Sequence, residues 1–436
     1  MVGRGGLALL WCCTRPLPMN LIFKVARQLA PWLQRGRGEA LVVASARVAS
    51  AAGALVVAVV SARVLGPAGR GEIVLVVTIS ILCMGLVDLG TNTSARIRIL
   101  QGDGTRIEDY LGLSLVLTVV QALMTAGVML LPKLSGGGLS LETVVVGIAL
   151  SSAMFLAHML VDACFAVRLT LHAAARDALA GGIPLVLVLA AAAVGDLSVE
   201  GVLWLLTAGY LVGAARLWLV VRRVAGRPVF HVDRWRPLIR SGLPVLGGSF
   251  SEAVAYRSDR LVVGIATTAA ALGIYSVAAT AVELPRLLMI PATQILSNRI
   301  ASGEVDRVSI RGVCSRLVLA YCVVLGVVGL AGGSLILPLV GDGFDGIHTP
   351  LLVMAVGEVF FGVYLIAVAV LMGMARFRRL VLPGVLGALT VVAGGGLVVP
   401  EFGIIGAAWV RLAGFGVMAV AAGWATYGEL RSRATL

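Results

Sequence analysis

The residues best suited to chemistry are ionisable side chains that lie inside long apolar runs of the chain. The densest set falls within residues 241–264. At about 100° per residue, several polar side chains of this run share one arc of a helix surface, about 100° wide. The arc contains Ser249, Glu252, Tyr256, Asp259 and Arg260. Arg257 lies outside the arc, about 140° from Glu252.

A polar arc of this kind is unsuited to a lipid-facing surface, because a charge at membrane depth costs about 3 kcal/mol. Either the arc forms a salt-bridge cluster that pins helices together, or it lines a cavity that binds an anionic group. Arginine suits a diphosphate, because its guanidinium stays charged in a low dielectric and binds phosphate in a fork geometry. Arg47 lies about 9 Å into its own apolar run. It either faces the same cavity or extends its long side chain to the interface.

A second set of residues in apolar runs could bind an ion, pass protons or control a gate. Its members are Asp88, His158, Asp162, Glu283, Arg286 and Glu358. His158 and Asp162 are four residues apart, as are Asp88 and Asn92, so each pair shares a helix face. Each residue of the set either takes part in ion coupling or forms hydrogen bonds between helices.

Glu283 and Arg286 need a separate interpretation, because they are three residues apart and bracket Pro285. They form either a self-compensated structural bridge or part of a kinked gating helix, whose freed carbonyls would line a cavity. The sequence leaves the role of Arg411 open.

The elements that must position these residues are membrane-spanning helices. Of the 436 residues, 59% are hydrophobic and 13% are charged, and the mean hydropathy is +1.01. Soluble domains have about 45–50% apolar and about 25% charged residues. A spanning helix needs about 20 apolar residues, and twelve such runs are present. They cover residues 41–64, 73–93, 109–131, 142–167, 179–195, 200–221, 241–264, 271–298, 313–340, 350–373, 380–400 and 405–427.

The positive charges follow this topology. With the N-terminus placed inside, 25 of the 35 basic residues fall in inside segments, and only Arg70 and Lys133 fall in outside loops. This asymmetry predicts a protein of the cell membrane with both termini cytoplasmic. The net charge of +13 is therefore explained without nucleic acid. No Gly-Lys-Ser/Thr loop is present, so we expect no ATP-driven work.

The twelve spans predict an all-α integral membrane protein with two six-helix lobes around a central cavity. Because six is even, the two lobes would be parallel repeats. We expect a basic cytoplasmic N-terminal tail at 1–40, lobes at 41–221 and 241–427, a basic linker at 222–240, and a C-terminal tail at 428–436. Translation could begin at Met1 or at Met19.

Two turns support the duplication and carry a family resemblance. The stretch from Ala62 to Glu72 resembles the first-hairpin signature of the polysaccharide flippases, in the multidrug/oligosaccharidyl-lipid/polysaccharide exporter superfamily. Three further stretches are similar to the same family, namely 258–264, 271–276 and 402–408. The Thr267-Thr268 turn departs from the family, since it has no Gly-Pro pair.

The resemblance implies movement of a lipid-linked oligosaccharide by alternating access. We expect Arg260 and Arg47 to contribute to a site for the diphosphate of this cargo, with Arg257 a weaker candidate. The alternatives are a multidrug or peptidoglycan-precursor exporter of the same superfamily and, from another class, an integral-membrane glycan-handling enzyme. Short outside loops and the lack of an Asp-x-Asp motif in any loop disfavour an enzyme.

No nucleophile is arranged with a base, so we assign no catalytic residues. The six cysteines show no metal-ligand spacing and are interpreted as buried apolar residues. We expect no cofactor and no metal. The expected partners are the lipid-linked oligosaccharide and membrane lipids, together with a glycan polymerase or glycosyltransferases of the same pathway. Frequent Arg, Ala, Gly and Val suggest a bacterium with a GC-rich genome.

Overall fold

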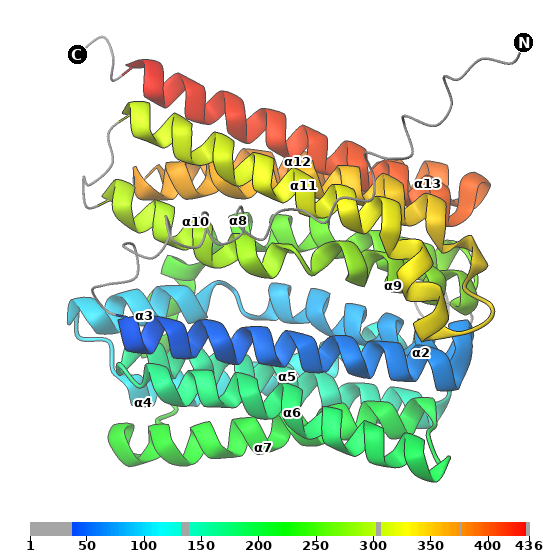
Figure 1. The fold of residues 1–436 in the computed structure, drawn as a ribbon. Helices are drawn as coiled ribbons and strands as arrows, with labels where there is room; N and C mark the ends of the chain where they lie inside the picture. The colour runs from blue at the N-terminus through cyan, green and yellow to red at the C-terminus, as the bar shows by residue number, and fades with distance from the viewer. Residues whose placement is uncertain (1–36, 132–138, 302–306, 375, 433–436) are drawn as a thin grey trace, which may run out of the picture.

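The computed structural model describes residues 37–131, 139–301, 307–374 and 376–432, and every element in these ranges is helical (Figure 1). Two short 3-10 helices, η2 (Asp345–Ile347) and η3 (Phe377–Leu380), join longer α-helices. The α-helices are α2 (Arg37–Val87), α3 (Thr91–Gln101), α4 (Ile107–Met129), α5 (Leu141–Ala166), α6 (Thr170–Val194), α7 (Val199–Ala225), α8 (Val232–Ala266), α9 (Ala269–Glu283), α10 (Arg286–Ala301), α11 (Arg307–Val340), α12 (His348–Gly373) and α13 (Val381–Ser432).

The helices provide the twelve predicted spans. Eight described segments are long and apolar enough to cross a membrane, and two of them, Ser45–Val87 and Val381–Glu429, are 43 and 49 residues long. Since about 20 residues cross a bilayer, each of these two holds two spans. α8 provides a further span, and α9 with α10 provides another, broken at Leu284 and Pro285. The prediction of a twelve-span all-α membrane protein is confirmed.

The turns inside α2 and α13 are sharp because each contains a glycine with a positive φ. Gly66 has φ 68° and ψ −175°, a conformation that is strained for any residue with a Cβ. Gly403 has φ 57°. Pro67 follows Gly66 and starts the second span, where its missing N–H is tolerated. The predicted Gly-Pro hairpin is therefore the physical turn between the first two spans.

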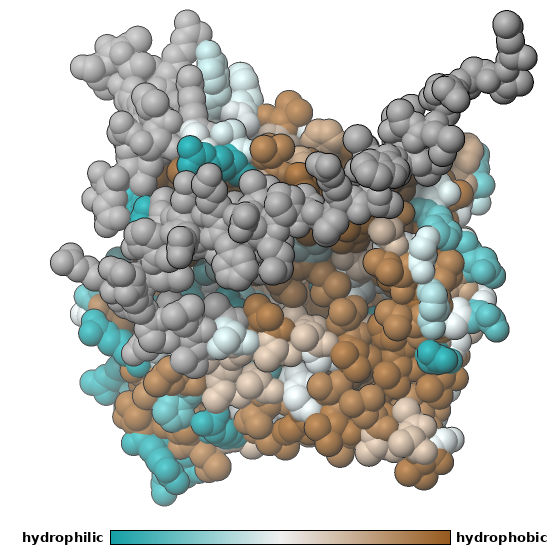
Figure 2. All heavy atoms as spheres, in the orientation of Figure 1, coloured by the Kyte–Doolittle hydropathy of each residue, from teal (hydrophilic) through white to brown (hydrophobic). Residues whose placement is uncertain are grey.

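The spans form two groups, with α2 to α7 on one side and α8 to α13 on the other (Figure 1). The start of α2 and the end of α13 lie at the same end of the bundle. Hydrophobic residues dominate the middle of the face in Figure 2, and hydrophilic residues gather toward its left and right ends. This pattern fits helices that cross a bilayer. The central cavity and the exact lobe boundaries stay predictions.

The basic segment predicted as a linker at 222–240 is largely helical. α7 continues to Ala225 and α8 starts at Val232. Arg222 and Arg223 lie in the last turn of α7, where positive charge is favoured by the helix dipole. Arginines that stop a span in the sequence therefore need not stop the helix.

The two groups touch through backbone at the turns of their first hairpins. A Cβ at Gly71 would overlap the Ala269 carbonyl, and a Cβ at Gly273 would overlap the Pro67 carbonyl. Only glycine permits this approach between α2 and α9. The small residues quoted for the family resemblance thus have a packing role at this end of the bundle.

Candidate functional site

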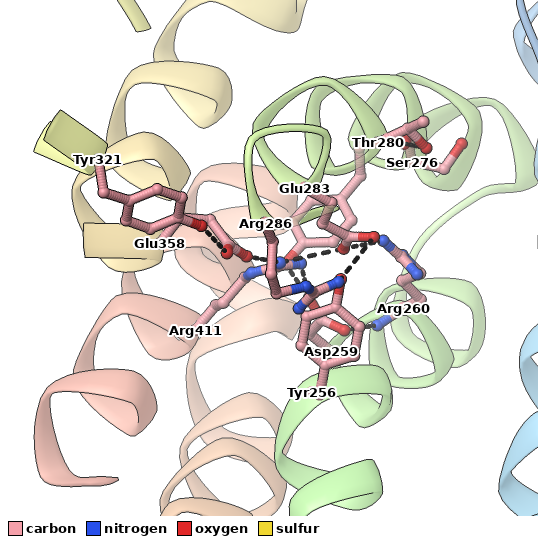
Figure 3. A network of polar contacts seen from close by, with 11 residues as sticks. Tyr256, Asp259, Arg260, Ser276, Thr280, Glu283, Arg286, Tyr321, Glu358 and Arg411 are labelled. Carbon is pink, nitrogen blue, oxygen red and sulfur yellow. Dashed lines mark hydrogen bonds and ion pairs between the residues drawn. The ribbon is translucent and has the colours of Figure 1, made fainter. Parts of the chain in front are cut away.

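The most concentrated group of charges surrounds Arg411 in α13, whose side chain is 0% exposed (Figure 3). Its Nη1 donates to Asp259 Oδ2 at 2.9 Å, and its Nη2 donates to Glu283 Oε1 at 3.0 Å and to Glu358 Oε1 at 2.6 Å. The three carboxylates come from α8, α9 and α12. One guanidinium therefore joins four helices.

Two further arginines complete the network. Arg260 donates to Glu283, and Arg286 Nη2 lies 3.8 Å from Glu283 Oε2. Asp259, Glu283 and Glu358 are thus matched by three arginines, so the cluster is neutral when all its members are ionised. A buried ion is tolerated only when it is paired and its remaining hydrogen-bonding atoms are satisfied. The network meets the condition of pairing, because it contains three acidic and three arginine side chains.

Tyrosines satisfy further carboxylate oxygens of the network. Tyr275 donates to Asp259 Oδ2 at 2.7 Å, and Tyr321 lies 3.4 Å from Glu358 Oε2. Tyr275 is fully buried in α9. These hydroxyl groups replace the water that the carboxylates would bind if exposed.

Tyr256 of α8 forms the aromatic side of the network. The guanidinium carbon of Arg286 lies 3.8 Å from the centre of its ring, and that of Arg411 lies 5.3 Å away. Arg286 also donates to the Tyr256 hydroxyl. Phe361 and Phe415 pack against Tyr256, with ring centres 5.4 and 6.1 Å away. The arginines are thus held by cation–π contacts as well as by carboxylates.

The structure brings together part of the polar arc predicted in residues 241–264. Asp259 and Arg260 are buried in the Arg411 network, and Tyr256 lies beside them. Glu252 instead accepts from Tyr364 at 3.0 Å. Ser249 is exposed and donates to the Val245 carbonyl at 3.1 Å.

Arg257 lies at the edge of the Arg411 network, and Arg47 lies outside it. The Arg257 guanidinium lies 4.9 Å from the centre of the Tyr256 ring, and no described carboxylate is within ion-pair distance of it. Arg47 Nε lies 3.8 Å from Asp177 Oδ2 of α6, and its side chain is 47% exposed. The structure therefore places Arg47 with α6 and not beside Arg260.

A second polar group lies in the first six spans. Asn92 Nδ2 lies 2.9 Å from His158 Nε2, and Arg96 Nη1 lies 3.0 Å from Asp162 Oδ1. Asp88 Oδ1 accepts from the Asn92 backbone N–H at 3.2 Å. His158 and Asp162, which share a face of α5, thus both bind residues of α3.

The second set of predicted residues therefore divides between two clusters. Asp88, His158 and Asp162 lie in the first six spans, whereas Glu283, Arg286 and Glu358 meet in the last six. Arg411 and Tyr275 were not predicted as site residues. The available signal for Arg411 was its place inside the predicted span 405–427, because a charge at membrane depth needs a partner, a cavity or a route to the interface.

The comparisons with known proteins agree with this fold. The chain matches the family described as "Polysaccharide biosynthesis protein" over residues 38–297. No curated protein matched it. It is similar to an inward-facing multidrug resistance MATE family transporter of the MOP superfamily, with a TM-score of 0.68, 14% identity and coverage of 90% of this chain and 98% of that chain.

A second solved structure, the eukaryotic MATE transporter AtDTX14, gives a TM-score of 0.64 at 15% identity, covering 90% of this chain and 96% of that chain. At such identities the likeness shows the fold alone. The family match covers more than half of the 436 residues, and the resemblance predicted from the hairpin residues is confirmed. The chain belongs to the polysaccharide biosynthesis protein family and has the fold of the MATE transporters of the MOP superfamily.

Proposed function

We propose that the protein moves a polyprenyl-diphosphate-linked oligosaccharide across the cytoplasmic membrane by alternating access. The family match supports a role in polysaccharide biosynthesis, and the fold is that of transporters. We also propose that both termini are cytoplasmic, that the protein has no enzymatic activity, and that enzymes of the same glycan pathway supply its cargo.

The class of cargo is inferred from which arginines of the last six spans are paired with carboxylates. Arg260 is enclosed in the Arg411 network and its charge is matched by Glu283. Arg257 is half-buried and stacks on Tyr256. It has no described carboxylate within 4.0 Å, and its charge acts on Glu283 from a longer distance. We therefore propose Arg257, rather than Arg260, as the arginine of the last six spans that binds the diphosphate.

A complementary positive group lies in the first six spans. Arg47 and Arg176 share one carboxylate, because both lie within 4.0 Å of Asp177, so this group keeps an excess positive charge. Arg176 also lies 5.1 Å from the centre of the Tyr210 ring. Arg257 is close enough to the Tyr210 hydroxyl to act on it electrostatically. Arg176 contacts Tyr210 and Arg257 acts on it from the other half, and we propose that an anionic group binds between these two arginines.

A drug-cation exporter is the competing function, since one similar structure is of a multidrug transporter. Such a cargo favours unpaired acids and aromatic rings. In the Arg411 network, Asp259, Glu283 and Glu358 are all paired with arginine. This pairing favours the anionic cargo.

The test is export of glycan by cells that carry Arg257→Ala, Arg257→Lys or Arg47→Ala, compared at equal amounts of membrane-inserted protein. We expect Arg257→Ala to lower export by about tenfold or more, because one charge-assisted fork to a phosphate contributes about 1.5–3 kcal/mol. Arg257→Lys should lose less, since it keeps the charge.

Arg316→Ala is the matched control, because Arg316 is an exposed residue of α11. Its export should equal that of the unmodified protein. Wild-type export by Arg257→Ala and Arg47→Ala together would remove the support for an anionic cargo. Resistance to cationic drugs that depends on the protein would favour the exporter instead.

A further inference from the structure

The contact between Asn92 and His158 depends on which groups carry protons. The Asn92 Oδ1 accepts the Thr93 backbone N–H, and this fixes Nδ2 as the atom that faces His158 Nε2 at 2.9 Å. An amide Nδ2 only donates. His158 Nε2 must therefore accept, which requires a neutral imidazole with its proton on Nδ1.

Protonation of His158 turns this contact into two donors facing each other. The imidazolium would lose Asn92 and be attracted to the nearby carboxylates of Asp88 and Asp162. Asp162 is at present bound by Arg96 of α3. An imidazolium that competes with Arg96 for Asp162 thus also weakens the ion pair between Arg96 of α3 and Asp162 of α5.

The charged and titratable groups around His158 come from every neighbouring element. Asp88 acts on it electrostatically from the end of α2. Asp162 of α5 is four residues from His158, and Arg96 of α3 binds it. Asp88, Asp162 and Arg96 all act electrostatically on Tyr110 of α4. The nearest charged groups printed for α7 and α8 are Arg216, which acts on Cys164, and Arg234, which pairs with Asp109. A histidine ordinarily changes charge between about pH 5 and pH 8, and Asp88, which acts on His158, is the second group here that can take up a proton.

The opposite side of α3 is attached to α8, the first helix of the other half. Ser94 Oγ donates to the Leu238 carbonyl at 3.0 Å, and Arg98 Nη1 donates to the Pro237 carbonyl at 3.2 Å. Gly90 packs directly on the Gly242 carbonyl. These contacts use hydroxyl, guanidinium and backbone groups, which keep their protonation state near neutral pH.

The helical conformation is interrupted between α2 and α3, so α3 can change its angle relative to α2. Leu89 has φ 54° and Gly90 has φ 67°, so the chain between α2 and α3 adopts a left-handed conformation that a leucine rarely takes. α3 is therefore a short helix that connects α5 in one half to α8 in the other through side-chain hydrogen bonds.

We propose that His158 is a proton-controlled link: neutral His158 holds α3 on α5 through Asn92, and protonated His158 releases α3, which remains attached to α8. The inference rests on the proposed transport function and deepens it, since it names the proton as the species that changes the junction between the halves. His158 is a positioning residue here and does not contact cargo.

The test measures distances between spin labels in the full chain, reconstituted in lipid nanodiscs without cargo, after replacement of the native cysteines. Labels at Gln101→Cys and Leu171→Cys report α3 against α6, and labels at Gln101→Cys and Arg240→Cys report α3 against α8. As the pH falls from about 8 to about 5.5, we expect a longer distance to appear for the first pair. The second pair should not change.

Two variants identify the residue responsible. In His158→Gln the pH effect should be lost, because glutamine cannot become charged. His172→Gln, a matched change in α6, should retain it, and so should Asp88→Asn, which removes the second group near Asn92 that can bind a proton. Asn92→Leu should show the longer distance at both pH values. The proposal is overturned if the first pair gives the same distances at both pH values or if its shift persists in His158→Gln. Since no cargo is present, neither result depends on which molecule is transported.

Discussion

Arg411 is the residue on which the packing of the last six spans depends most directly. Its fork reaches Asp259, Glu283 and Glu358 at 2.6 to 3.0 Å. A lysine would supply the charge, but its compact ammonium cannot direct donors to three separate carboxylates as the planar guanidinium does. The guanidinium also stays charged in a low dielectric, so the network does not depend on a dissociable cation.

Replacing Arg411 should therefore strongly destabilise the folded protein. Arg411→Met removes the partner of three buried carboxylates, and we expect a loss of about 3–5 kcal/mol in the free energy of unfolding. Arg411→Lys should lose less. Thermal unfolding of the purified protein in detergent measures both, with Arg316→Met on the exposed side of α11 as the control. A melting temperature for Arg411→Met equal to that of the control would show that the network is not stabilising.

The Tyr275 hydroxyl allows a milder test of the same network. Tyr275→Phe leaves the Asp259 carboxylate without its 2.7 Å donor and should lower the free energy of unfolding by about 1–3 kcal/mol. Tyr427→Phe, at an exposed position in α13, should be neutral. Equal melting temperatures for the two variants would contradict the assigned hydrogen bond.

The sequence could place some of these residues but not their partners. Helical spacing put Asp259 and Arg260 on one polar arc, and it predicted the Glu283 and Arg286 pair, which the structure contains at 3.8 Å. It could not join Asp259 to Arg411, because 152 residues separate them. Contacts between helices depend on how the helices rotate and pack, and periodicity along one helix does not contain that information.

At the scale of elements, hydropathy predicted the spans better than the helices. The lengths of apolar runs identified twelve crossings, but α2 and α13 each contain two crossings joined at a glycine. α8 extends well before its predicted start at residue 241 because its basic first turns continue outside the apolar run. Pro285 lies between α9 and α10, so the apolar run predicted at 271–298 is broken there.

The contact between α2 and α9 gives a prediction for one element pair. Gly273→Ala would press a methyl group into the Pro67 carbonyl, and backbone cannot rotate away as a side chain can. We expect a loss of about 1–3 kcal/mol in the free energy of unfolding. Gly416→Ala, where a Cβ meets nothing within 4 Å, should be neutral or up to about 1 kcal/mol stabilising. Thermal unfolding distinguishes them, and equal effects would contradict the close approach.

At the scale of the whole molecule, the even number of spans brings the start of α2 and the end of α13 to the same end (Figure 1). The connections from α6 to α7 and from α11 to α12 lie at the opposite end, whereas α7 joins α8 at the first end. Charge asymmetry in the sequence predicts that the first end is cytoplasmic. The structure shows which loops share an end, and the positive-inside rule predicts the side of the membrane on which each end lies.

This orientation can be tested by labelling single cysteines with a membrane-impermeant maleimide on intact cells. Asp196 and Asp342 are exposed residues in the connections α6 to α7 and α11 to α12, and Arg227 is exposed between α7 and α8. These sites avoid Gly226 and Gly343, which have positive φ, so cysteine adds no backbone strain. We expect Asp196→Cys and Asp342→Cys to react, and Arg227→Cys to react only after the membrane is permeabilised. Labelling of Arg227→Cys on intact cells, with protection of the other two, would invert the topology and place the basic loops outside.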